Sequence, residues 1–222
     1  MHDSSLADIF QPKSAATYPF TATGAPSKVT VVNGPVVSEV RHVYGDSSIE
    51  QVFRLYNGSD TLEVEYRIGP IDVTDGDGKE VISHFDTDVA SDNKFETDVN
   101  GMQVNTRTRD TRATLWPGGP PYFSQTDPVS GNYFAVNTAA SLSDLVQASA
   151  ADRRRFSVLI DRAEGGTSMA PGQLELMLHR RLTHGCRWGM CENNEQVRMA
   201  GALLGVLGVV KTTWLPVRHS VV

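Results

Sequence analysis

The chain has 222 residues, of which 40% are hydrophobic and 21% are charged, and its formal net charge is -6. This length accommodates one large β domain or two small ones, with enough apolar residues for a sizeable core. Because 26 acidic side chains outnumber 20 basic ones, the composition argues against a protein that binds the phosphate backbone of nucleic acid.

Residues 1–28 are rich in Ser, Ala, Thr and Pro and show no sustained period, so we expect an irregular N-terminal segment. They also lack the apolar stretch of a signal peptide. From residue 29 onward, β-branched residues become frequent and turn residues recur at short intervals. This change predicts that a β domain begins there.

The clearest predicted element is a hairpin centred on Asn57-Gly58. The sequence predicts antiparallel strands over 49–56 and 61–68, joined by a type I′ turn with positive φ at both turn residues. Apolar side chains alternate with charged ones in the second strand, and we expect them on its buried face: Leu62, Val64, Tyr66 and Ile68.

Further short strands and turns follow along the chain. Strands are predicted at residues 80–85, 95–97, 102–107, 133–137, 156–160 and 173–180. Turns are predicted between them, including one at Gly165-Gly166, and residues 139–155 read equally well as a helix or as a loop. Many short strands punctuated in this way indicate a large antiparallel β-sandwich.

Paired carboxylates are the first candidates for chemistry. Asp86 and Asp88 lie two residues apart near a predicted strand end, so both are expected on one face, as general acid/base work in a glycosidase requires. Solvated or turn-capping aspartates are the favoured interpretation, because charged residues are mostly exposed. Asp72, Asp75 and Asp77 are interpreted as a plain turn, since they lack the spacing of an EF-hand.

Metal and nucleophile motifs are weak. His179 and His184 have no accompanying HExxH glutamate, and Cys186 and Cys191 form a single pair where structural zinc requires four ligands. We therefore expect no metal site in this chain, and the two cysteines are interpreted as free thiols or one small-loop disulfide.

One motif has a meaning for processing. Asn57-Gly58-Ser59 is the chain's single Asn-x-Ser/Thr sequon, and it falls on the predicted hairpin turn. Asn57 is therefore a candidate N-glycosylation site in a secreted protein.

Several blocks of sequence, in order, resemble lysosomal-type α-mannosidases of glycoside hydrolase family 38. The similarity covers residues 29–182, and the blocks that carry it are 34–41, 51–56, 63–71, 78–88, 95–101, 107–110, 125–138, 161–166 and 174–182. The family resemblance implies a galactose-mutarotase-like supersandwich, here incomplete. It leaves residues 183–222 as a divergent tail.

The resemblance also implies where the chemistry of the family resides. The catalytic aspartates and the zinc ligands belong to an N-terminal domain, so this chain is expected to supply neither, and Asp86 and Asp88 become structural. The β region of the family lends a Tyr and an Arg to the sugar site. Here Asp8 stands at the Tyr position, and Arg187 lies one position early after the Arg-Arg-Leu run. Arg181 and Arg187 are thus the substrate-proximal candidates.

These features predict the β-sandwich portion of an α-mannosidase that acts on terminal α-D-mannose of glycans, located in the lysosome or vacuole or secreted. No nucleic-acid or membrane partner is expected. A stand-alone carbohydrate-binding module is the alternative, with Trp116, Tyr122 and Phe123 as its aromatic platform, and a non-functional fragment is a third. Because the tail departs from the family pattern, we expect residues 183–222 to pack poorly and to be removable without loss of the fold.

Overall fold

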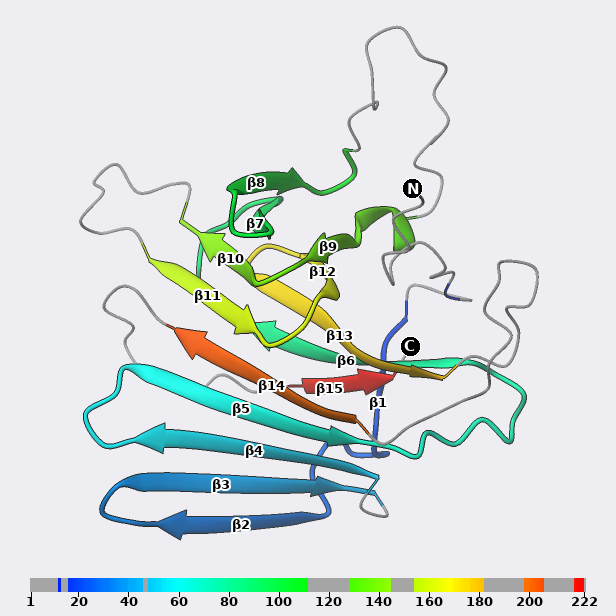
Figure 1. Cartoon of the computed structure of the whole chain (residues 1–222). Coiled ribbons are helices and arrows are strands. Elements are labelled where there is room, and N and C mark those ends of the chain that lie inside the picture. Colours follow the sequence, from blue (N-terminus) through cyan, green and yellow to red (C-terminus); the bar gives the residue numbers. More distant parts are fainter. Residues whose placement is uncertain are drawn as a thin grey trace, which may run out of the picture.

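The computed structural model describes residues 12, 16–45, 48–111, 128–144 and 154–181, together with the backbone of 198–205 and 218–221. These residues form two antiparallel β-sheets that pack face to face around a shared apolar core (Figure 1). The predicted β-sandwich class is confirmed.

The larger sheet has nine strands. Their spatial order is β2 (Lys28–Asn33), β3 (Val37–Tyr44), β4 (Ile49–Tyr56), β5 (Thr61–Ile68), β14 (Arg198–Gly205), β11 (Arg155–Ile160), β10 (Ala139–Ser143), β7 (Lys94–Val99) and β8 (Gln103–Thr108).

The smaller sheet has six strands. Their order is β1 (Tyr18–Pro19), β15 (Arg218–Val221), β6 (Lys79–Asp86), β13 (Gln173–Arg181), β12 (Glu164–Thr167) and β9 (Phe134–Val136). A short 3₁₀ turn, η2 (Ser130–Asn132), precedes β9.

The β4–β5 hairpin has the predicted strands, but its turn is of a different type. Leu55 pairs with Leu62 and Ile49 with Ile68, which is the expected register. Positive φ occurs at Gly58 (79°) but not at Asn57, and the connection contains four residues, 57–60. The prediction of a type I′ turn is therefore wrong. A four-residue connection requires only one left-handed position, which Gly58 fills.

The core lies between the two sheets. Val64, Tyr66 and Ile68 of β5 are at most 1% exposed, and they pack in one cluster with Val81 and Phe85 of β6. The Tyr66 hydroxyl lies 2.7 Å from Ser83 Oγ, so a hydrogen bond joins the two sheets across the apolar layer. A buried hydroxyl pair of this kind meets the hydrogen-bonding needs of both groups and aligns the two sheets.

Strand β12 corrects the predicted turn at Gly165-Gly166. A Cβ at Gly165 would lie 2.6 Å from Met177 Sδ, and one at Gly166 would lie 2.7 Å from Val136 Cγ2. The glycines are therefore needed for the close approach of neighbouring side chains rather than for a reversal of the chain. The local sequence of a Gly-Gly pair is the same for a turn and for a close tertiary contact, so the pattern alone does not separate the two roles.

Two further segments differ from expectation. Residues 139–143, which read as helix or loop, form β10 between β7 and β11. In the tail, the backbone of β14 lies between β5 and β11, and the backbone of β15 lies between β6 and β1. The structure thus places two segments of the tail within the sheets. In the part of the chain described here, no helix is long and apolar enough to span a membrane.

Strands β2, β3 and β4 form one end of the nine-stranded sheet (Figure 1). Several of their apolar side chains are open to solvent. Val29 and Val31 of β2 are 53% and 60% exposed, and Leu55 of β4 is 47% exposed. The opposite face of these strands carries an ion-pair ladder in which Arg54 contacts Glu39 at 2.6 Å and Glu65 at 2.5 Å. This end of the sheet is therefore charged on one side and apolar on the other.

Candidate functional site

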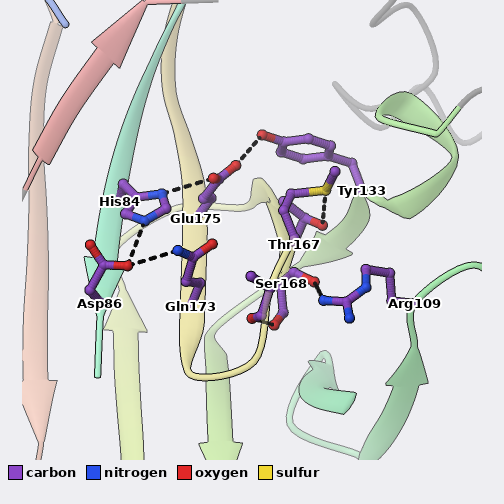
Figure 2. Close-up of polar contacts among 10 residues, drawn as sticks. His84, Asp86, Arg109, Tyr133, Thr167, Ser168, Gln173 and Glu175 are labelled. Atoms are coloured by element: carbon purple, nitrogen blue, oxygen red, sulfur yellow. Dashed lines mark hydrogen bonds and ion pairs between the residues drawn. The ribbon is translucent and has the colours of Figure 1, made fainter. Parts of the chain in front are cut away.

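Polar side chains gather on the outer face of the six-stranded sheet, which is the face turned away from the nine-stranded sheet. In β6, Ser83 points inward to Tyr66, so His84 points outward. In the neighbouring strand β13, Glu175 lies opposite His84 and Gln173 lies opposite Asp86. Figure 2 shows these four side chains joined in one network.

The imidazole of His84 is the centre of this network. Its Nδ1 lies 2.8 Å from Glu175 Oε1, and its Nε2 lies 3.0 Å from Asp86 Oδ1. Gln173 Nε2 donates to the same Asp86 oxygen at 2.9 Å. Because each ring nitrogen faces a carboxylate oxygen, the site favours the doubly protonated, charged imidazole.

The buried end of the network is covered by the segment around η2. Tyr133 donates its hydroxyl to Glu175 Oε2 at 2.9 Å, so both oxygens of Glu175 have partners. The Tyr133 ring packs in a second apolar cluster with Ile82, Val129 and Met177. This cluster closes the outer face over Glu175, whose side chain is only 6% exposed.

A β-bulge in β13 adds a second buried charge pair to the same face. Met177 pairs with Ile82 but His179 pairs with Val81, so one extra residue, Leu178, interrupts the ladder. Without the bulge, strict alternation would turn Arg180 toward the interior. With it, Arg180 Nε donates to Glu80, and both side chains are less than 10% exposed.

Burial and charge shift the protonation equilibria of these groups. Burial opposes the protonation of His84, but the hydrogen bonds and charges of Glu175 and Asp86 outweigh it and raise the pKa of His84 above its usual value. Burial also raises the pKa of Glu80 to about 7, against the attraction of Arg180. For Tyr133, burial and the adjacent Glu175 carboxylate raise the phenol pKa well above normal.

The His84 site should make the fold more stable in acid. A raised pKa in the folded state gives stability that is complete below the unfolded pKa of His and is lost as pH rises through the folded value. As the pH rises through the folded-state pKa of His84, the free energy of unfolding should therefore fall more steeply in the wild type than in a His84→Gln variant. Urea titrations across this range measure the difference.

His42 provides the matched control for this measurement. Burial lowers the pKa of His42, so His42→Gln should change the pH dependence in the opposite direction. Equal slopes for wild type and His84→Gln would show that the imidazole of His84 does not bind its proton more tightly in the folded state.

Asp86 and Asp88 do not form a catalytic pair in this structure. Asp86 binds His84 and Gln173, whereas Asp88 forms an ion pair with Arg154 and is 74% exposed. A glycosidase needs two carboxyl groups free to flank a glycosidic bond. Here both aspartates bind neighbouring side chains.

The other candidate residues are placed as follows. Arg181, the last residue of β13, donates Nη1 to the carbonyl of Ile71 at 2.6 Å and thereby holds the loop before β6. Asp72 accepts the backbone N–H of Thr74 at 2.9 Å, which is a turn-capping contact. Asn57 is exposed on the β4–β5 turn. Several candidates lie outside the described residues: Asp8, Trp116, Tyr122, Phe123, His184, Cys186, Arg187 and Cys191.

Sequence reasoning missed a second polar centre at Asp98 of β7. Its Oδ1 accepts backbone N–H groups from Asn137, Thr138 and Ala139 at 3.2, 2.7 and 2.9 Å. Its Oδ2 accepts the Thr138 hydroxyl at 2.6 Å and the Gly101 N–H at 3.0 Å. The one signal in the sequence is an acidic residue within a strand whose neighbouring residues are expected to be buried. Such a residue needs a hydrogen-bond partner, but the sequence does not identify that partner.

Comparison with known proteins agrees with this architecture. Residues 7–185 match the family model described as "Glycosyl hydrolases family 38 C-terminal domain". The chain is 40% identical over 188 residues to an alpha-mannosidase of Canavalia ensiformis, covering 81% of this chain and 18% of that protein. It is 41% identical over 179 residues to the lysosomal alpha-mannosidase of Homo sapiens, covering 81% of this chain and 16% of that protein.

The match begins 22 residues before the expected boundary at residue 29, so it includes most of the N-terminal segment. The chain spans less than a fifth of the length of these relatives. The match covers most of the chain, and the β-sandwich is the expected fold. The chain therefore belongs to the C-terminal domain family of glycoside hydrolase family 38.

Proposed function

We propose that this chain is the non-catalytic β-sandwich portion of an α-mannosidase that removes terminal α-D-mannose from glycans. The family match over residues 7–185 is the observation that carries the proposal, together with relatives named alpha-mannosidases at about 40% identity. In this proposal the catalytic carboxylates and the zinc ion of the enzyme belong to a separate catalytic domain. Mannose-containing glycans are bound only when that domain is present.

The contacts of the buried acidic groups support a structural role. Glu175, Asp98 and Glu80 each bind donors from neighbouring strands or loops. Their carboxylates hold the sandwich together and are not presented to a ligand. Arg181, the last residue of β13, and Arg187, six positions later in the sequence, remain the residues proposed to lie near the sugar. The family resemblance places the contributed Arg in this part of the sequence.

The proposed compartment is the lysosome or vacuole, because relatives of this chain are named lysosomal alpha-mannosidases. The acid-stabilised His84 network is consistent with an acidic compartment.

An assay and a chimera test the proposal together. The purified chain should not hydrolyse an aryl α-mannoside, with or without added zinc, because it supplies no nucleophile or acid/base pair. A relative's lysosomal alpha-mannosidase whose matching segment is replaced by residues 7–185 should retain hydrolysis. Turnover by the chain alone that survives repeated purification contradicts the proposal, and so does a folded but inactive chimera.

A further inference from the structure

The turn between β4 and β5 presents an acceptor asparagine in open surroundings. Asn57 is exposed, and a Cβ built on Gly58 would meet no atom within 4 Å. The turn lies at the end of the β2–β5 part of the larger sheet (Figure 1). The position next to the acceptor asparagine is therefore open to solvent.

Backbone hydrogen bonds hold the sequon in a defined conformation. Asn57 N donates to Val36 O at 2.8 Å, which ties the turn to the start of β3, and Ser59 N donates to Tyr56 O at 3.0 Å. Ser59 Oγ accepts the N–H of Thr61 at 3.1 Å. The main-chain groups of the turn are thus occupied, while the Asn57 side chain is exposed to solvent.

Three apolar side chains near the turn are open to solvent. Val36 is 67% exposed, Leu55 is 47% exposed and Tyr56 is 44% exposed. Leu55 shares the face of the sheet that carries Val29 and Val31, whereas Tyr56, the next residue of β4, lies on the opposite, charged face. Strand β2 is an edge strand whose six residues are all exposed. Exposed apolar surface beside a free sheet edge promotes association between chains.

We propose that Asn57 carries an N-linked glycan that covers this apolar end of the sheet. In the transfer, the Asn57 Nδ2 forms the bond to the anomeric carbon of the first sugar and loses one proton. The donor is a lipid-pyrophosphate-linked oligosaccharide, and the lipid pyrophosphate leaves. A glycan is bulky and solubilising, so one attached here offsets the exposure of Val36 and Leu55. The inference rests on the proposed passage of this chain through the secretory pathway.

The test directs the full chain into the secretory pathway of eukaryotic cells with an added signal peptide. Peptide mass analysis after enzymatic deglycosylation should show conversion of Asn57 to Asp. The Asn57→Gln and Ser59→Ala variants should migrate as the deglycosylated wild type does. An unmodified Asn57 in the secreted wild type overturns the proposal.

The turn between β7 and β8 supplies a matched control. Met102→Thr gives residues 100–102 the sequon pattern on an exposed turn at the opposite edge of the same sheet. In the Asn57→Gln background, a glycan at Asn100 should not restore solubility, so the yield of soluble monomer should remain severalfold below the wild-type yield. Equal rescue by the Asn100 glycan would overturn the covering role.

Directed secretion separates this inference from the proposed function. Modification of Asn57 in the directed protein supports the acceptor site whether or not the chain belongs to an active mannosidase. If the protein from its own cells lacks the glycan while the directed protein carries it, Asn57 is a competent acceptor but the proposal that this chain carries the glycan is overturned.

Discussion

Removal of residues 183–222 should abolish cooperative unfolding of the chain, because it removes β14, the strand that joins the two halves of the nine-stranded sheet. Eight residues of β14 are in register with β5 and four are in register with β11. Without β14, β5 and β11 each present a row of unpaired backbone groups over the apolar core. Thermal unfolding followed by circular dichroism should show a broad transition or none.

This expectation is the reverse of the one drawn from the sequence, in which the tail was dispensable. The contrast can be tested with proline. Ala202→Pro in β14 should destabilise the chain by about 3 kcal/mol or more, because every N–H of a strand with two neighbours is needed. Proline at Val31 or Val32 of the edge strand β2 should be tolerated at whichever position has its N–H facing solvent. A stable proteolytic core that ends near residue 181 would instead support the sequence-based expectation.

Replacing Asp98 with alanine should lower the free energy of unfolding by about 4 kcal/mol, because it leaves several backbone N–H groups without their acceptor. Three of these N–H groups belong to residues 137–139, which lead from β9 of one sheet into β10 of the other. The loss should therefore weaken the connection between the two layers. Chemical denaturation of the variant measures it directly.

Two comparisons make the Asp98 result specific. Asp98→Asn should lose about half as much stability, since it keeps one acceptor oxygen but places an amide against the Gly101 N–H. Asp60→Asn, on the exposed β4–β5 connection, should have little effect. The hydrogen bonds from Thr138, Ala139 and Gly101 outweigh burial and lower the pKa of Asp98, so its contribution should be complete above about pH 4 and lost as pH falls further. A loss for Asp98→Ala no larger than that for Asp60→Asn would mean that the carboxylate does not hold this connection.

Alternation along a strand was sufficient to predict the hairpin. Charged and apolar residues alternate through β5, so both the strand and its buried face followed from local sequence. The same reasoning failed at Gly165 and Gly166, where glycine is required by the side chains of Met177 and Val136. A contact of that kind leaves no local pattern.

The His84 network was not predictable for a related reason. His84 and Glu175 are 91 residues apart in sequence, and Tyr133 and Glu175 are 42 apart. The periodicity of apolar residues and the composition show that a polar residue lies within an apolar strand. Its hydrogen-bond partner, however, depends on which strands become neighbours in the sheet. The order β6–β13–β12 is a property of the topology, so the network emerges only once the sheet is assembled.

The extra residue in β13 has a consequence for how this strand tolerates change over evolutionary time. The residues before and after Leu178 follow opposite phases of the pleat. Deleting one residue there would barely change the sequence identity, but it would turn every later side chain of β13 to the other face of the sheet. Arg180 would enter the apolar layer, and Glu80 would keep a buried charge without its counter-ion. Single-residue gaps should therefore be rarer than substitutions between positions 173 and 181 of functional relatives.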